Sequence, residues 1–178
     1  MNSPITLHPG PGAGFDHPFE MLAACHERVR RMLALLQRLG EHLRSHGNDG
    51  QARQAAADVL RYFEQAAPAH HEDEERHVFP RLLREGDAAQ RAVVERLQAD
   101  HRAMAAQWPL VRAVLERVAA GGPAPDAAEA AACDTFAALY VAHLPAEDEV
   151  VFPAARARMD AAAQQAMGEE MAQRRGLR

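Results

Sequence analysis

Two segments of the sequence each place a histidine four residues before a glutamate and close with a Phe-Pro pair. One contains His70 and Glu74 and the other contains His143 and Glu147, and aligning the Phe-Pro pairs superposes the two histidines and the two glutamates. Residues four apart lie on the same face of a helix, about 6 Å apart along its axis. The imidazole and carboxylate of each segment can therefore bind one metal ion or two adjacent ions.

Two further histidines extend this repeat toward the N-terminal side of each half. His26 lies 44 residues before His70, and His101 lies 42 residues before His143. Each is surrounded by apolar residues at helical spacing, which indicates a buried helix face. Each half of the chain thus combines a helix with one inward histidine and a helix with His-x-x-x-Glu, and four such helices direct four imidazoles and two carboxylates into one volume.

The chemistry of this cluster predicts a site for two metal ions. Two buried carboxylates are costly without a cation, and the inward helix faces offer no arginine as a partner. Mixed imidazole and carboxylate ligands suit iron or manganese, whereas the absence of a cysteine cluster argues against structural zinc. Because a carboxylate has two oxygens, Glu74 and Glu147 are predicted to bridge the two ions.

The composition and the helix signals predict an all-α protein. Alanine fills 39 positions, against 14 for Ile, Val and Thr together, which favours helices over strands. Four long helices joined by short turns predict an up-down-up-down four-helix bundle with a short C-terminal helix. Residues 1–15, rich in Pro and Gly, are predicted to form a flexible leader and residues 16–176 a single domain. Apolar periodicity, capping boxes and glycine breaks place the helices at 18–46, about 51–83, 88–120, from 127 onward, and about 160–175.

The charge pattern excludes several classes of partner. All 20 basic residues are arginines, the net charge is -5, and no basic block indicates a nucleic-acid interface. No stretch approaches the roughly 20 apolar residues of a membrane span, and no secretory signal is recognisable. Two cysteines are too few for a disulfide framework. We therefore expect a cytoplasmic protein without a nucleic-acid or membrane partner.

As a combined pattern, these residues resemble the hemerythrin-like, HHE cation-binding family, from about Phe15 to Gly176. The resemblance implies a four-helix bundle that holds a non-haem di-iron centre with histidine and bridging carboxylate ligands. The expected cofactor is two iron ions per chain, bridged by an oxo or hydroxo group, with manganese as the alternative metal. The expected metal ligands are His26, His70, Glu74, His101, His143 and Glu147.

Two departures from the oxygen-carrying hemerythrins bear on function. Those proteins usually have a second histidine four residues from the one on the third helix, but Ala105 and Leu97 occupy these positions. Their last carboxylate is typically an aspartate five residues after its histidine, whereas Glu147 follows at four. Fewer protein ligands leave more positions open, so we expect a protein that binds, senses or reacts with oxygen, nitric oxide or peroxide, with enzymatic activity left open and no protein partner indicated.

Three alternative functions compete with this reading. Iron storage or buffering in a ferritin-like bundle would use a Glu-x-x-His element, which Glu74 and His77 provide, but no second copy exists. Iron-sulfur cluster repair proteins of the family typically carry an additional N-terminal cysteine-containing module, and residues 1–15 contain no cysteine. A metal-free helical interaction module would need both buried carboxylates protonated or paired, and we rank it last.

The other histidines have simpler interpretations. His71 competes with His70, but Leu144 at the equivalent position of the second copy favours His70. His77 is expected at the surface and His17 at a helix N-cap. His42 and His46 suit the C-terminal end of their helix, and His8 belongs to the leader.

Neighbouring acidic residues and one cysteine also lie close to the predicted ligands. Cys25 precedes His26 and is predicted to be a buried, inert thiol. Pro145 is expected to bend its helix. A solvated acidic face is predicted for Glu72, Asp73, Glu75, Asp148 and Glu149.

Overall fold

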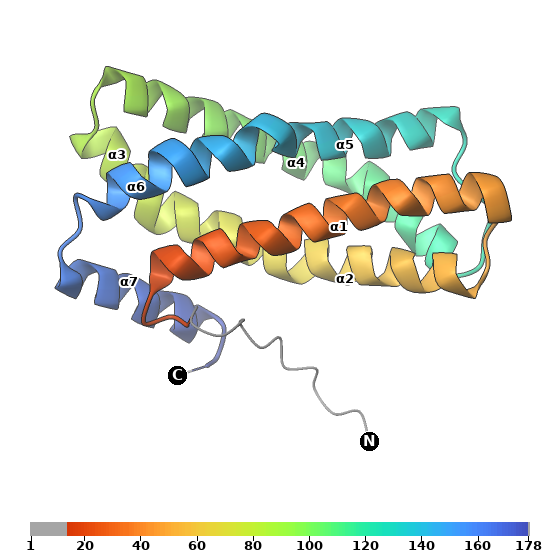
Figure 1. Cartoon of the computed structure of the whole chain (residues 1–178), viewed down its shortest axis with the longest axis horizontal. Coiled ribbons are helices and arrows are strands. Elements are labelled where there is room, and N and C mark those ends of the chain that lie inside the picture. The colour runs from red at the N-terminus through yellow and green to blue at the C-terminus, as the bar shows by residue number, and fades with distance from the viewer. Residues whose placement is uncertain (1–13, 178) are drawn as a thin grey trace.

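Four long helices lie side by side in the structure, a computed structural model that describes residues 14–177 (Figure 1). Short turns join them at alternate ends of the molecule, and no strand occurs within the described residues. The all-α prediction is confirmed, and none of the described helices is both long and apolar enough to cross a membrane. The elements are α1 (Pro18–His46), α2 (Gly50–Asp73), η1 (Glu74–Val78), α3 (Phe79–Glu85), α4 (Ala88–Ala119), α5 (Ala127–Ala146), η2 (Glu147–Val151), α6 (Phe152–Arg156) and α7 (Ala161–Arg174).

The helix ends lie where the capping signals predict them. The side chain of Asp87 accepts a hydrogen bond from the Gln90 amide, 2.8 Å away, and the reciprocal bond completes a capping box at the start of α4. A second box formed by Asp126 and Glu129 opens α5. His17 does occupy the N-cap position of α1, but its side chain makes no capping hydrogen bond.

Each helix that carries the His-x-x-x-Glu pattern widens into a π-helical turn at the glutamate. The turns η1 and η2 begin at Glu74 and Glu147, and the amide of Phe152 donates to the Glu147 carbonyl five residues back. The proline after each Phe cannot donate and crowds the carbonyl four residues earlier, which favours the wider turn. Because of this turn, Val151 is buried, whereas Val150, three residues after Glu147, is 39% exposed.

The proline inside each of these helices lies upstream of the π turn. The helix α2 continues through Pro68, and α5 continues through the exposed Pro145. Pro80 and Pro153 instead follow the π turns directly, near the starts of α3 and α6. The observed interruption of both helices is therefore the π turn that begins at the glutamate.

The bundle interior contains two apolar cores with a polar layer between them. On α2, Ala67 belongs to the core near the α1–α2 turn, and Val78, in the adjoining η1, belongs to the core near α7. On α4, Met104 and Leu97 are divided between the same two cores. The buried histidines and glutamates lie between these residues along each helix, so apolar packing isolates them from water on both sides.

The C-terminal helix α7 packs at the end of the bundle nearest the polar layer (Figure 1). Phe15, the last residue of the predicted leader, lies against Gly168 in α7, where a Cβ would come within 1.8 Å of its carbonyl oxygen. Residues 1–13, including His8, lie outside the described residues. The predicted fifth helix is confirmed, and a glycine is required where the chain crosses it.

An ion-paired cluster attaches α7 to the end of α2. Asp73 is wholly buried and accepts hydrogen bonds from Arg174 and Arg175, the latter at 2.7 Å. The prediction that Asp73 belongs to a solvated acidic face is therefore wrong. Because Asp73 directly precedes Glu74, α7 fixes the backbone beside the polar layer.

Replacing both arginines by methionine should strongly destabilise the protein, because the Asp73 carboxylate would stay buried without a partner. We expect Arg174→Met/Arg175→Met to lower the free energy of unfolding by about 3–5 kcal/mol. Adding Asp73→Leu should recover much of this loss. Urea unfolding measures both effects.

Arg156→Met provides the matched control, since it removes an arginine that pairs with Glu20 at the surface. This change should cost about 1 kcal/mol or less. A double variant no less stable than this control would contradict the role of the buried ion pair.

Candidate metal centre

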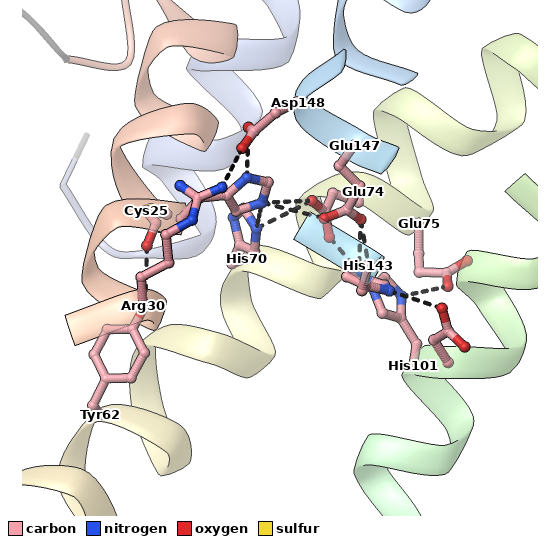
Figure 2. A network of polar contacts seen from close by, with 12 residues as sticks. Cys25, Arg30, Tyr62, His70, Glu74, Glu75, His101, His143, Glu147 and Asp148 are labelled. Carbon is pink, nitrogen blue, oxygen red and sulfur yellow. Dashed lines mark hydrogen bonds and ion pairs between the residues drawn. The ribbon is translucent and has the colours of Figure 1, made fainter. Parts of the chain in front are cut away.

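All six residues predicted from the repeat meet in the polar layer between the two cores. Figure 2 labels five of them, His70, Glu74, His101, His143 and Glu147. None of the six is more than 8% exposed, and His26, Glu74 and Glu147 are wholly buried. The helical spacing places them there because each lies on the buried face of its helix. Helix α1 supplies His26, α2 with η1 supplies His70 and Glu74, α4 supplies His101, and α5 with η2 supplies His143 and Glu147.

The two oxygens of Glu74 face histidines from different halves of the chain. Oε1 lies 3.1 Å from Nε2 of His70 and 3.8 Å from Nε2 of His26. Oε2 lies 3.5 Å from Nε2 of His101. Glu74 thus spans the space between the histidines of the first half and those of the second.

Glu147, which comes from the second half of the chain, spans the same space and reaches a histidine of the first half. Its Oε2 lies 3.2 Å from Nε2 of His26, and its Oε1 lies 3.1 Å from Nε2 of His143 and 3.9 Å from that of His101. The cluster therefore has two subsites, one at His26 and His70 and one at His101 and His143. Each subsite receives one oxygen from each glutamate.

Six of the atoms that face the centre have no hydrogen-bond partner among the described residues, whereas Nε2 of His26 and Nε2 of His70 lie 3.0 Å apart and pair with each other. All four carboxylate oxygens of Glu74 and Glu147 lack one, as do Nε2 of His101 and Nε2 of His143. Buried polar atoms normally have partners, so a group of unpartnered atoms aimed at one volume indicates a cation-binding site. Nitrogen and oxygen donors of these types are suited to iron or manganese.

Three of the four histidines donate from Nδ1 to a carboxylate outside the cluster. His26 donates to Asp148 at 2.7 Å and His101 donates to Glu75 at 2.9 Å. His143 lies 3.2 Å from Asp100 in the same way. A proton held on Nδ1 leaves Nε2 free as a ligand and fixes the ring orientation.

These contacts correct the predicted acidic face in two more places. Glu75 and Asp148 are half-buried and orient histidines, whereas Glu72 and Glu149 are exposed as predicted. The sequence contained a signal for this role, because Glu75 and Asp148 occupy equivalent positions of the repeat, directly after each glutamate. Asp100 lies outside the two repeated His-x-x-x-Glu segments, so the repeat did not indicate that it binds His143.

The supporting contacts cross between the two halves of the chain. Glu75 from the first half binds His101 of the second, and Asp148 from the second half binds His26 of the first. The phenylalanines follow the same rule. Phe79 stacks on His101 and Phe152 stacks on His26, with ring centroids 5.4 Å and 5.1 Å apart, and both phenylalanines are buried.

His70 differs from the other three histidines in what its Nδ1 faces. Within residues 14–177 this atom has no hydrogen-bond partner, and the half-buried thiol of Cys25 lies beside the ring. Burial raises the pKa of Cys25, but the interaction with His70 outweighs it, so the pKa of the thiol is lowered. The prediction that Cys25 is buried is wrong, because the residue is half-buried.

The remaining described histidines lie outside this cluster, with one exception. His71 joins it from the side of His101 and His143. His77 is half-buried and lies 2.6 Å from Glu170 in α7, instead of at the open surface. His42 and His46 stack on each other at the far end of α1.

Opposite charges within the cluster shift the pKa values of its members. Burial alone would lower the pKa of His26, but Asp148 and the two glutamates of the site raise it to about 10. Burial is likewise outweighed at His70 and His101, whose pKa values are raised by Glu74. Burial would raise the pKa of Glu74, but the histidines hold it well below its usual range. Protonated imidazoles therefore balance the carboxylates where no metal does.

Comparison with known proteins assigns this arrangement to a family. The model of the hemerythrin HHE cation binding domain matches residues 17–155, which include all six clustered residues. The chain belongs to the hemerythrin HHE cation-binding family. An uncharacterized protein of Haemophilus influenzae (strain ATCC 51907 / DSM 11121 / KW20 / Rd) is 34% identical over 112 residues, which cover 63% of this chain and 64% of that protein.

Membership of the HHE family and the geometry agree on the type of site. HHE domains bind metal cations, and the His/Glu cluster of this chain can hold them. The match begins at His17 and ends at Ala155, so it includes both copies of the repeat but not α7.

The stability of the metal-free protein should decrease as the pH rises above neutrality. The pKa of His26 is about 10 in the folded chain and about 6.5 in an unfolded one. Its contribution is therefore fully present below about pH 6.5 and is lost as the pH rises toward 10. Urea unfolding in the presence of a chelator at pH 6.5, 8 and 9.5 measures this trend.

A His26→Gln variant has no titrating group at this position, so its stability should fall less steeply over the same range. Equal slopes for the variant and the wild type would contradict the raised pKa of His26.

Proposed function

We propose that this protein is a non-haem di-iron protein that binds, and senses or reacts with, a small ligand such as oxygen, nitric oxide or peroxide. The domain comprises residues 16–176 in an up-down-up-down bundle, and manganese is the alternative metal. The observation that carries the proposal is the orientation of Glu74 and Glu147, each of which directs one oxygen to each pair of histidines. A single ion would not require the two oxygens of each glutamate to point toward different histidines.

The proposed ligands divide equally between two ions. His26 and His70 would hold one ion, His101 and His143 would hold the other, and Glu74 and Glu147 would each offer one oxygen to both. When bound, the irons would supply redox chemistry and open coordination positions. Since position 105 is alanine, α4 contributes one histidine to the cluster, and the six proposed ligands would leave coordination positions open for an exogenous ligand.

The chain's own residues would control access and protonation at these ions. Phe79 and Phe152 cover the two histidines on which they stack and exclude water from that side. Asp148 and Glu75 hold the Nδ1 protons of His26 and His101, which keeps Nε2 directed at the centre. A buried site with oriented ligands and apolar surroundings favours small uncharged ligands over larger anions.

Iron storage through a ferritin-like element is less well supported. That reading requires His77 to act with Glu74, but Nε2 of His77 lies 2.6 Å from Glu170 in α7. His77 is thus engaged in attaching the C-terminal helix.

Protein purified without a tag should contain about two irons per chain, with a ligand-to-iron charge-transfer band in the oxidised form. Glu74→Gln/Glu147→Gln keeps the side-chain shape but removes both charges and should abolish iron binding. Metal analysis and the visible absorption spectrum measure these outcomes.

Glu72→Gln/Glu149→Gln is the matched control, because it removes two exposed carboxylates, each two residues from one of the proposed bridges. Its iron content should equal that of the wild type. A folded wild type that takes up no metal, or a Glu74/Glu147 variant that retains it, would refute the di-iron assignment.

Adding oxygen, nitric oxide or peroxide to the reduced, iron-loaded protein should change its visible spectrum with at least one of the three. Reversal on removing the ligand indicates a carrier or sensor, whereas consumption with multiple turnovers indicates an enzyme. The Glu72→Gln/Glu149→Gln control should respond as the wild type does. A loaded protein inert toward all three ligands would contradict the proposed function.

A further inference from the structure

The two subsites differ in one residue that approaches the cluster from α2. His71 follows His70 in sequence, whereas the equivalent residue of the second half is Leu144, a member of the apolar core. One nitrogen each of His71, His101 and His143 forms a group whose atoms all lie within 4.8 Å of one another. The repeat therefore places a fifth imidazole on one side of the site only.

The neighbours of His71 are other rings, and they leave its nitrogens without a polar partner among the described residues. Its ring stacks on that of His101, with centroids 4.1 Å apart, and lies near Tyr140 and His143. Among the described residues, none makes a hydrogen bond or an ion pair with it. By contrast, His101 and His143 both have an Nδ1 held by a carboxylate and an Nε2 without a partner.

The missing histidine of α4 makes this position chemically significant. Ala105 lies one turn beyond His101 on the same face of α4 and offers no ligand atom. His71 reaches the same subsite from the neighbouring helix α2. A ligand lost from one helix can thus be replaced from another without altering the bundle.

We infer that His71 is a seventh protein ligand, which binds the ion at His101 and His143 and makes the two ions unequal. This inference rests on the proposed di-iron function. The ion at His71 would have three imidazoles and two carboxylate oxygens, and the ion at His26 would have two of each. The less crowded ion, beside His26 and His70, would then be the one that receives the exogenous ligand.

His71→Phe tests this inference, because phenylalanine retains a flat ring against His101 but provides no ligand atom. In the iron-loaded wild type, Mössbauer spectra should show two unequal iron environments. In the variant, only one of them should change, and one of the two irons should bind at least about tenfold more weakly in a chelator competition. His46→Phe, which removes an exposed histidine at the far end of α1, should match the wild type.

If His71→Phe does not fold, His71→Ala with added imidazole decides the question. Imidazole should restore the wild-type Mössbauer spectrum and iron content, and failure to do so would overturn the role of His71. Two irons bound with unchanged spectrum and affinity in a folded His71→Phe variant would also overturn it, while leaving the di-iron proposal intact. A wild type without iron would instead overturn the proposed function, and this inference with it.

Discussion

Two wholly buried carboxylates, with no arginine beside them, impose the electrostatic requirement that the rest of the bundle satisfies. None of the four oxygens of Glu74 and Glu147 has a hydrogen-bond partner, and burying such charges is unfavourable without compensation. The raised pKa values of His26 and His70 show that the metal-free chain would compensate with protons. Cations at the centre would displace those protons and satisfy the same oxygens directly.

Reciprocity between the halves explains how a simple repeat produces an oriented site. Each His-x-x-x-Glu helix widens at its glutamate, which turns the following carboxylate toward the inward histidine of the other half. The phenylalanines after the π turns cover the same histidines. Cys25 and Asp100 also occupy equivalent positions, but one is a thiol beside His70 and the other a carboxylate bound to His143. The symmetry is therefore approximate, and its exceptions lie next to the proposed ligands.

The sequence predicted the helices, their caps and the six clustered residues, because helical periodicity and capping are local properties. The sequence did not predict that Val151 is buried and Val150 exposed, because a π turn contains more residues than an α-helical turn. The regular helical spacing therefore no longer identifies the buried positions after Glu147. Asp148 lies within such a turn and faces His26 instead of the solvent. Asp73 lies just before the other turn and is buried because Arg174 and Arg175 pair with it. The partners of these residues come from α7 and α1, and no local pattern indicates such contacts.

The hydrogen bond between His26 and Asp148 joins residues 122 positions apart, which has a consequence for folding. Contacts of such long range form late, because the intervening chain must first be ordered. A nascent chain that ends before η2 would contain the four predicted histidine ligands and Glu74 but would lack Glu147, the second carboxylate that spans the two subsites. The complete centre can thus form only after the last long helix has docked, and the metal would be acquired as a final step of folding.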